Sequence, residues 1–129
     1  MNEETKTDYI KYRLDKAFES LADAKLLSQN KRWNSCVNRL YYAAYYAVIA
    51  LLLQDNYDGS THKGTRNQFN IKFIKEGIID KKYGKLYSKL FDWRQKGDYG
   101  DLFNFDEEQV SPLIEPTEEL IKEIQKLIK

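Results

Sequence analysis

The side chains best suited to chemistry lie on a helix that begins with an arginine and continues as an almost wholly apolar run. Arg39 opens the sequence RLYYAAYYAVIALLL, and at about 100° per residue Tyr42 and Tyr46 share its face. A buried arginine is costly unless it is paired, so we expect Arg39 to meet a carboxylate or to open into a cleft that receives an anion. The alternative is that the tyrosines pack a core and a dimer seam.

A second polar group lies in the segment STHKGTR. His62, Lys63 and Arg66 stand where a turn enters a predicted helix, and they could bind phosphate together with the backbone donors at that helix N-terminus. His62 is the single histidine of the chain. The alternative is that this histidine only caps the helix or fixes the loop.

A third group lies in WRQKGDYGD. Asp98 and Asp101 follow Arg94, and these carboxylates are expected to accept a hydrogen-bonded salt bridge from Arg94 or Arg39. Two carboxylates can also hold Mg²⁺, but the sequence lacks a glycine-rich phosphate cradle, so we expect a structural role and no metal or cofactor. The single Cys36 and the single histidine cannot complete a zinc site.

The elements that position these groups are all predicted to be helices. Apolar residues recur at three- and four-residue steps, with no sustained two-residue alternation, and the helix that carries Arg39 is apolar on nearly every side. We therefore expect an all-α, up-and-down four-helix bundle with one additional short helix, in a single domain over 1–129. The predicted helices span 7–29, 33–54, 65–76 and 82–96, followed by one that begins after Asp106.

The ends of these helices are predicted from particular residues. Gly77 and Gly97 are expected to end the third and fourth helices, and residues 55–64 read as a loop. Asp106 is a good N-cap, with Gln109 at the position of its capping-box partner. Pro112 and Pro116 predict a kink or a restart in the last helix, because each removes a backbone donor.

Composition limits the possible partners. The 129 residues include 21 Lys and Arg against 20 Asp and Glu, a net charge of +1, which excludes a surface-wide basic field. The charge is divided, however: residues 62–97 hold 10 basic against 3 acidic side chains, and residues 98–129 hold 3 against 9. These runs are either solvated helix faces or, in the basic case, a nucleic-acid surface.

The same composition limits the compartment. The charged N-terminal stretch is unlike a signal peptide, and the nearly uncharged run over 40–54 is shorter than the roughly 20 residues of a membrane helix. A core helix, a reducing compartment and a cytoplasmic location without a membrane partner are therefore expected.

Three strings in order, NRLYYAAYYAVIALLL, STHKGTRNQFNIKFIKEG and LFDWRQKGDYGD, resemble the HEPN superfamily, the higher eukaryotes and prokaryotes nucleotide-binding domain. The resemblance runs from about Tyr12 to Ile128 and is to small stand-alone proteins encoded beside minimal nucleotidyltransferases. It implies a homodimer, and in many members a metal-independent ribonuclease in which an arginine and a later histidine of one helix act on RNA. Arg39 matches the arginine, whereas Tyr46 stands where relatives often have histidine.

The resemblance assigns roles to the residues above. Arg39, Tyr46 and, from the neighbouring segment, His62 are the catalytic candidates. It also implies that a tyrosine of the YYAAYY run or Tyr99 could accept adenylate from the partner. The expected nucleotide- or RNA-binding residues are Asn38, Arg39, Tyr42, His62, Lys63, Arg66 and Arg94.

Three functions follow from these roles. The first is a partner of a nucleotidyltransferase in an RNA-targeting toxin–antitoxin or defence module, with ribonuclease activity lost or weakened, since tyrosine, with a pKa near 10, is a poor general base. The second is a non-catalytic dimer that binds a nucleotide or anion. The third is an active ribonuclease that uses Arg39 with His62.

Overall fold

The computed structural model describes residues 2–57, 59, 61–100 and 102–129, and within these the chain is helical and contains no strand. The predicted all-α class is therefore confirmed. The elements are α1 (Glu3–Gln29), α2 (Trp33–Gln54), α3 (His62–Phe69), the π-helical turn η1 (Asn70–Ile74), α4 (Lys81–Tyr99) and α5 (Glu107–Leu127).

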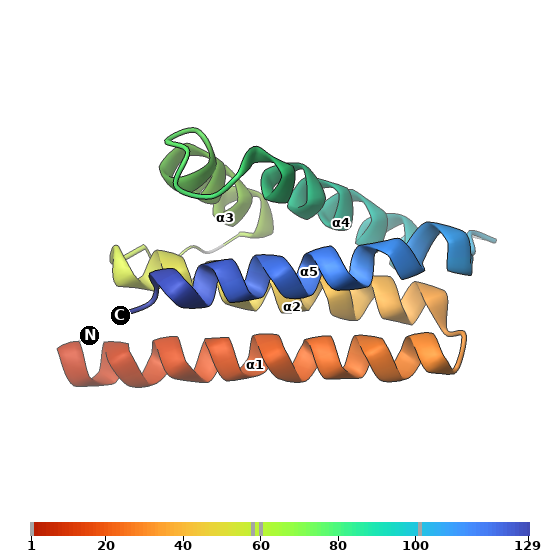
Figure 1. Ribbon diagram of the computed structural model, residues 1–129, viewed down its shortest axis with the longest axis horizontal. Helices are drawn as coiled ribbons and strands as arrows, with labels where there is room; N and C mark the ends of the chain where they lie inside the picture. Colours follow the sequence, from red (N-terminus) through yellow and green to blue (C-terminus); the bar gives the residue numbers. More distant parts are fainter. Residues whose placement is uncertain (1, 58, 60, 101) are drawn as a thin grey trace.

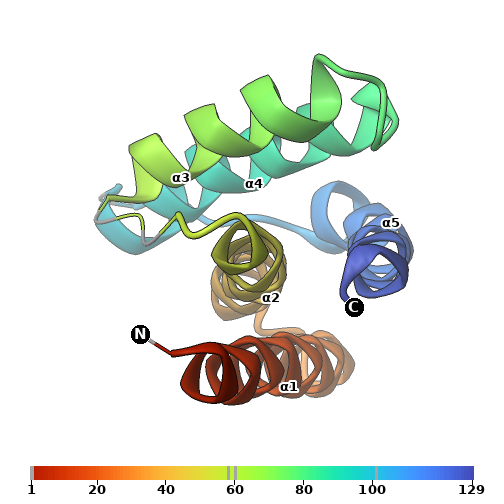
Figure 2. The same cartoon turned by 90° about the vertical axis from the view of Figure 1, so that its left-hand side faces the viewer.

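Helix α2 is the centre of the molecule. It packs against α1, α3, α4 and α5, and Figure 2 shows it between α1 on one side and the α3–α4 pair on the other. Both termini lie at the same end of the long axis (Figure 1). By length and composition α2 could span a membrane, but 72% of its most apolar window is buried inside the protein. Its apolar sequence is thus accounted for by its place in the core, as predicted.

The sequence predicted the second helix well and the first less completely. Trp33–Gln54 forms with the predicted bounds, because apolar residues surround it on nearly all sides. Helix α1 starts four residues before the predicted Thr7, because the side chain of Asn2 accepts a hydrogen bond from the amide of Thr5 and thereby caps an earlier turn.

The third helix begins earlier and is less regular than predicted. Thr61 is its N-cap and accepts a hydrogen bond from the Gly64 amide at 2.9 Å, so His62 is its first residue and does not cap it. The regular helix ends at Phe69 and continues as η1. Gly77, with φ of +74°, follows at the predicted stop, in a conformation that favours glycine.

The prediction that Gly97 ends the fourth helix is wrong. Helix α4 runs on to Tyr99, with Gly100 as its C-cap. Gly97 serves close packing instead, because a β carbon there would lie 3.1 Å from the ring of Phe105. The sequence alone does not show whether a glycine ends a helix or makes room for a neighbouring side chain.

For the last helix, the sequence predicted the N-terminal cap correctly and a restart incorrectly. Asp106 and Gln109 form the predicted capping box, in which each side chain accepts from the other residue's backbone amide. Of the kink or restart predicted at Pro112 and Pro116, the restart is wrong, since α5 runs unbroken from Glu107 to Leu127. Its buried face, with Leu113, holds the helix against the core despite the lost backbone donors.

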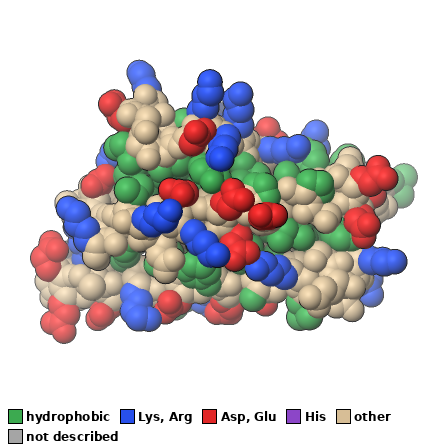
Figure 3. Space-filling model, viewed as in Figure 1, with side chains coloured by type: hydrophobic (Ala, Val, Ile, Leu, Met, Phe, Trp, Pro, Cys, Tyr) green, Lys and Arg blue, Asp and Glu red, His purple; other side chains and the backbone are tan. Residues whose placement is uncertain are grey.

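The divided charge of the sequence is visible on the surface. Figure 3 shows mainly Lys and Arg side chains over α3 and α4, whereas acidic and basic side chains are mixed over α5. In α4 the side chains of Lys81, Lys85 and Lys89 are exposed and follow one another at four-residue steps. The basic segment therefore faces solvent along one helix.

Candidate functional site

Two adjacent aromatic rings of α2 gather the cations and the histidine predicted from the sequence. The Arg39 guanidinium lies 5.0 Å from the centre of the Tyr42 ring, and that of Arg94 lies 4.7 Å from the centre of Tyr41 and 5.7 Å from that of Tyr42. The His62 ring centre lies 5.7 Å from Tyr41 and 5.9 Å from Tyr42. His62 of α3 and Arg94 of α4 thus meet α2 near Arg39.

Arg39 is held by an amide rather than by a carboxylate. Its Nε and Nη2 both donate to the Asn38 side-chain oxygen, at 3.0 and 2.8 Å, and the Asn38 nitrogen donates to Asp98 at 2.9 Å. A neutral acceptor orients the guanidinium and leaves its charge uncompensated. Among the described residues Arg39 is therefore fixed in direction by a neutral group and forms no salt bridge, although the carboxylate of Asp98 lines the same cleft.

A polar cleft opens beside this arginine. It has a volume of about 640 Å³ and lies where α2 faces the end of α4. Tyr99, which is 76% exposed, stands at its margin. Its lining residues are Leu27, Asn34, Ser35, Asn38, Arg39, Gly97, Asp98 and Tyr99.

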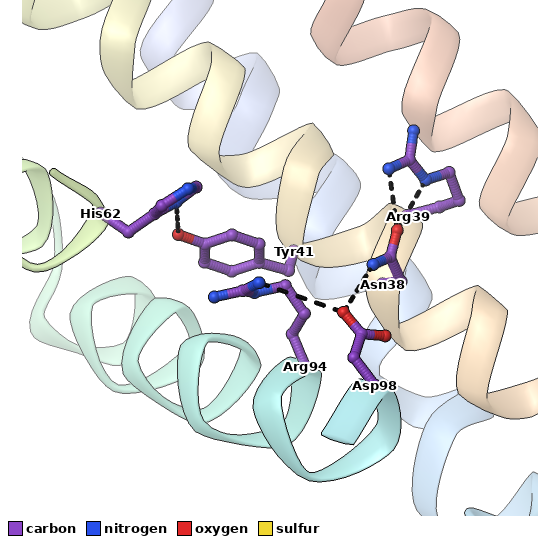
Figure 4. Close-up of polar contacts among 6 residues, drawn as sticks. All are labelled: Asn38, Arg39, Tyr41, His62, Arg94 and Asp98. Carbon is purple, nitrogen blue, oxygen red and sulfur yellow. Dashed lines mark hydrogen bonds and ion pairs between the residues drawn. The ribbon is translucent and has the colours of Figure 1, made fainter. Parts of the chain in front are cut away.

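Arg94 is the most deeply buried charge of the site. It is 8% exposed, and its Nε has no hydrogen-bond partner among the residues that the structure describes. The predicted salt bridge to Asp98 is present only at its outer limit, with Nη1 4.0 Å from the carboxylate, beyond hydrogen-bond distance. Figure 4 shows Arg94 lying along the face of Tyr41, toward His62. A buried guanidinium with so little compensation is costly, which is a property of binding sites.

His62 is fixed by the same ring. Its Nδ1 lies 2.7 Å from the Tyr41 hydroxyl, and its ring packs 4.5 Å from that of Tyr45. Burial lowers the pKa of His62 from the usual 6.5, and the nearby Arg94 lowers it further. Burial also raises the pKa of Tyr41. At neutral pH the pair therefore consists of an uncharged imidazole and an uncharged phenol.

Tyr46 lies on the other side of the aromatic cluster. Its ring contacts Tyr42 at 5.8 Å and lies 5.7 Å from the guanidinium of Arg13, which comes from α1. Tyr45 also contacts Tyr46 at 5.8 Å, and both Tyr42 and Tyr45 contact His62, so Tyr46 is linked to His62 through these two rings. The residue at the position of the expected histidine is placed among aromatic rings and a cation from another helix.

The remaining residues predicted for the site lie away from the rings of Tyr41 and Tyr42 or outside the described part of the chain. Arg66 packs over the ring of Phe91 at 4.3 Å, on the seam between α3 and α4, and Lys63 is exposed at the start of α3. Asp101 lies outside the described residues. Sequence reasoning missed Tyr41 as the partner of His62. Its four-residue spacing from Tyr45 was a signal that both face one neighbour, but not which neighbour.

The fold and this site define a small helical domain with an arginine-bearing central helix, and comparison with known proteins gives its family. The model of the HEPN domain matches residues 10–127. The chain belongs to the HEPN domain family.

Its relatives come from bacteria and archaea. A "UPF0332 protein" of Thermotoga maritima is 45% identical over 129 residues, which is 100% of this chain and 96% of that protein. The protein named "Putative toxin MJ0605" from Methanocaldococcus jannaschii is 33% identical over 120 residues, covering 93% of this chain and 89% of its own length. A second protein of that organism, "Putative toxin MJ0142", is 28% identical over 101 residues, or 78% and 69% of the two chains.

Proposed function

We propose that this chain is the HEPN component of an RNA-targeting toxin–antitoxin or defence module and the partner of a minimal nucleotidyltransferase. Its scaffold is an up-and-down four-helix bundle with one short helix, and it works in the cytoplasm as a homodimer. Ribonuclease activity through α2 is lost or weakened. The likeness to two proteins named as toxins supports the module.

The observation that carries the proposal is the state of Arg39. Its guanidinium is oriented by Asn38, stacked on Tyr42 and placed at a cleft of about 640 Å³ with no carboxylate bonded to it among the described residues. An arginine in this state binds phosphate well, because its charge and donors are already arranged. The RNA backbone is the phosphate ligand that fits a protein of this family.

We attribute the weakened ribonuclease activity of α2 to Tyr46. A tyrosine hydroxyl is a weaker proton acceptor than an imidazole, so it takes a proton from a ribose 2′-hydroxyl inefficiently. The guanidinium of Arg13 lies 5.7 Å from the Tyr46 ring centre, at a distance where it is attracted to the ring face. The arrangement supports packing rather than proton transfer at this position.

The nucleotidyltransferase partner needs an accessible acceptor. The tyrosines of the YYAAYY run are buried or half-buried, whereas Tyr99 is 76% exposed and lies at the cleft. Tyr99 is therefore the acceptor that we propose for adenylate. Mass spectrometry of the chain expressed with its chromosomal neighbour should find the added nucleotide on a peptide containing Tyr99, and not in a Tyr99→Phe variant.

Arg39→Ala tests the proposal directly, with Arg32→Ala as its matched control because Arg32 is an exposed arginine of the preceding turn. Binding of single-stranded RNA and arrest of growth on expression should be lost in Arg39→Ala and kept in Arg32→Ala. Equal behaviour of both variants would contradict the role of the cleft. RNA binding without any effect on growth would instead favour the non-catalytic binding module.

A further inference from the structure

We propose that His62, positioned by Tyr41 and paired with Arg94, forms a second acid–base site for RNA cleavage, in place of the histidine that α2 lacks. This inference rests on the proposed RNA-targeting function. It differs from an arginine–histidine pair on one helix, because the base comes from the start of α3 and its cation from α4.

The geometry of His62 is that of a fixed imidazole. One ring nitrogen, Nδ1, is held 2.7 Å from the hydroxyl of the fully buried Tyr41, and one ring face packs on Tyr45 at 4.5 Å between centres. In the tautomer with the proton on Nδ1, this nitrogen donates to the Tyr41 oxygen and Nε2 keeps a free lone pair. The Tyr41 hydroxyl can donate or accept, so it fixes the direction of the ring and is compatible with the tautomer in which Nε2 acts as a general base.

Arg94 supplies the charge that such a reaction needs. Its guanidinium lies over Tyr41 at 4.7 Å, and its buried Nε has no partner within the described part of the chain. The nearest acidic group, Asp98, is 4.0 Å away and already accepts from Asn38. A phosphate at the 8% of Arg94 that is exposed would balance the charge of the guanidinium, which offsets the cost of keeping Arg94 buried.

The proposed step is an internal transesterification, in which a ribose 2′-hydroxyl attacks the adjacent phosphodiester of the RNA. Nε2 of His62 takes the proton of a ribose 2′-hydroxyl, and the 2′-oxygen attacks the adjacent phosphorus while the bond from phosphorus to the 5′-oxygen breaks. The leaving 5′-oxygen takes a proton from water, and the imidazolium returns its proton to solvent. The products are a 2′,3′-cyclic phosphate and a 5′-hydroxyl. Arg94 stabilises the negative charge that develops on the phosphate oxygens.

Cleavage of total RNA and of single-stranded oligonucleotides in EDTA tests this assignment. We expect His62→Ala and His62→Gln to cut at a rate lower by about 100-fold or more, the usual contribution of a general base. Asn67→Ala, an exposed change on the same helix, is the control and should cut at the wild-type rate. Added imidazole should partly restore His62→Ala, which a purely structural role for His62 would not allow.

Two further variants separate the roles of the neighbours. Arg94→Met should lower the rate, and Tyr41→Phe, which changes a positioning residue, should also shift the pH at which the rate reaches half its maximum. Circular dichroism confirms that each variant is folded. An RNA-cutting rate that is equal in wild type and His62→Gln, or the absence of any cleavage by the wild type, would overturn the inference. Arg39-dependent RNA binding in that case would leave the proposed function intact.

Discussion

The contribution of the contact between Tyr41 and His62 to the free energy of unfolding can be measured by removing a single oxygen atom. Tyr41 is fully buried, and its hydroxyl lies 2.7 Å from Nδ1 of His62. Tyr41→Phe keeps the ring in the same space and deletes the hydroxyl that contacts His62, a hydrogen bond between uncharged groups. Such a bond contributes a net 0.5–1.5 kcal/mol, so the free energy of unfolding should fall by about 1 kcal/mol, roughly fivefold in the equilibrium constant.

The assay is urea unfolding followed by circular dichroism, in the form of a double-mutant cycle with His62→Ala. Because the two side chains contact each other, the cycle should show a coupling free energy of about 1 kcal/mol. A domain of this size has roughly 5–15 kcal/mol of stability, so every variant stays folded in water. Tyr42→Phe is the control, since the Tyr42 hydroxyl makes no hydrogen bond among the described residues.

Histidine-specific labelling adds a second observable, because the chain has 1 histidine and every signal belongs to His62. The Nδ1 resonance should move in Tyr41→Phe and stay in place in Tyr42→Phe. A coupling free energy near zero together with an unchanged Nδ1 resonance would refute the idea that Tyr41 positions His62.

Four further predictions follow from the same structure. Tyr46→His should raise cleavage of single-stranded RNA about 100-fold if the missing base is what weakens α2, as gel assays of the two proteins would show. Arg94→Met should raise the pKa of His62, because a cation that lowers it is removed, and NMR titration measures this directly. The low pKa of folded His62 gives a stability contribution that is full above pH 6.5 and is lost as pH falls through the folded pKa, so urea unfolding should show this pH dependence in wild type and not in His62→Gln. Asp106→Ala should lower the free energy of unfolding by about 1 kcal/mol through loss of the cap on α5, seen as a lower Tm.

Local patterns in the sequence were enough to predict most of the helices. The bounds of α2 and the capping box of α5 follow from apolar spacing and from two side chains three residues apart, so a single sequence suffices to predict them. Gly97 was wrongly predicted to end a helix. The need for glycine at this position comes from close packing against Phe105, which belongs to another segment. Pro112 and Pro116 did not restart the helix, because the buried face of α5 holds it against the core despite the lost backbone donors.

The site was predicted by residue type and not by pairing. Arg39, His62 and Arg94 were each recognised as candidates, but the contact that places His62 beside Tyr41 joins residues 21 positions apart in the chain. The acceptor of the Arg39 guanidinium is the neighbouring Asn38, where a carboxylate was one expectation. Helical periodicity gives the face of a residue, whereas the identity of its partner depends on how the helices pack.

The most direct test of the central claim is NMR titration of His62 with a single-stranded RNA that carries 2′-O-methyl groups and cannot be cleaved. We expect a saturable shift of the His62 resonances, with its midpoint at the RNA concentration that half-saturates binding. This shift should be lost in Arg94→Met and kept in Asn67→Ala. Binding that saturates while the His62 resonances stay in place would contradict the account, because the RNA phosphate would then lie elsewhere on the protein.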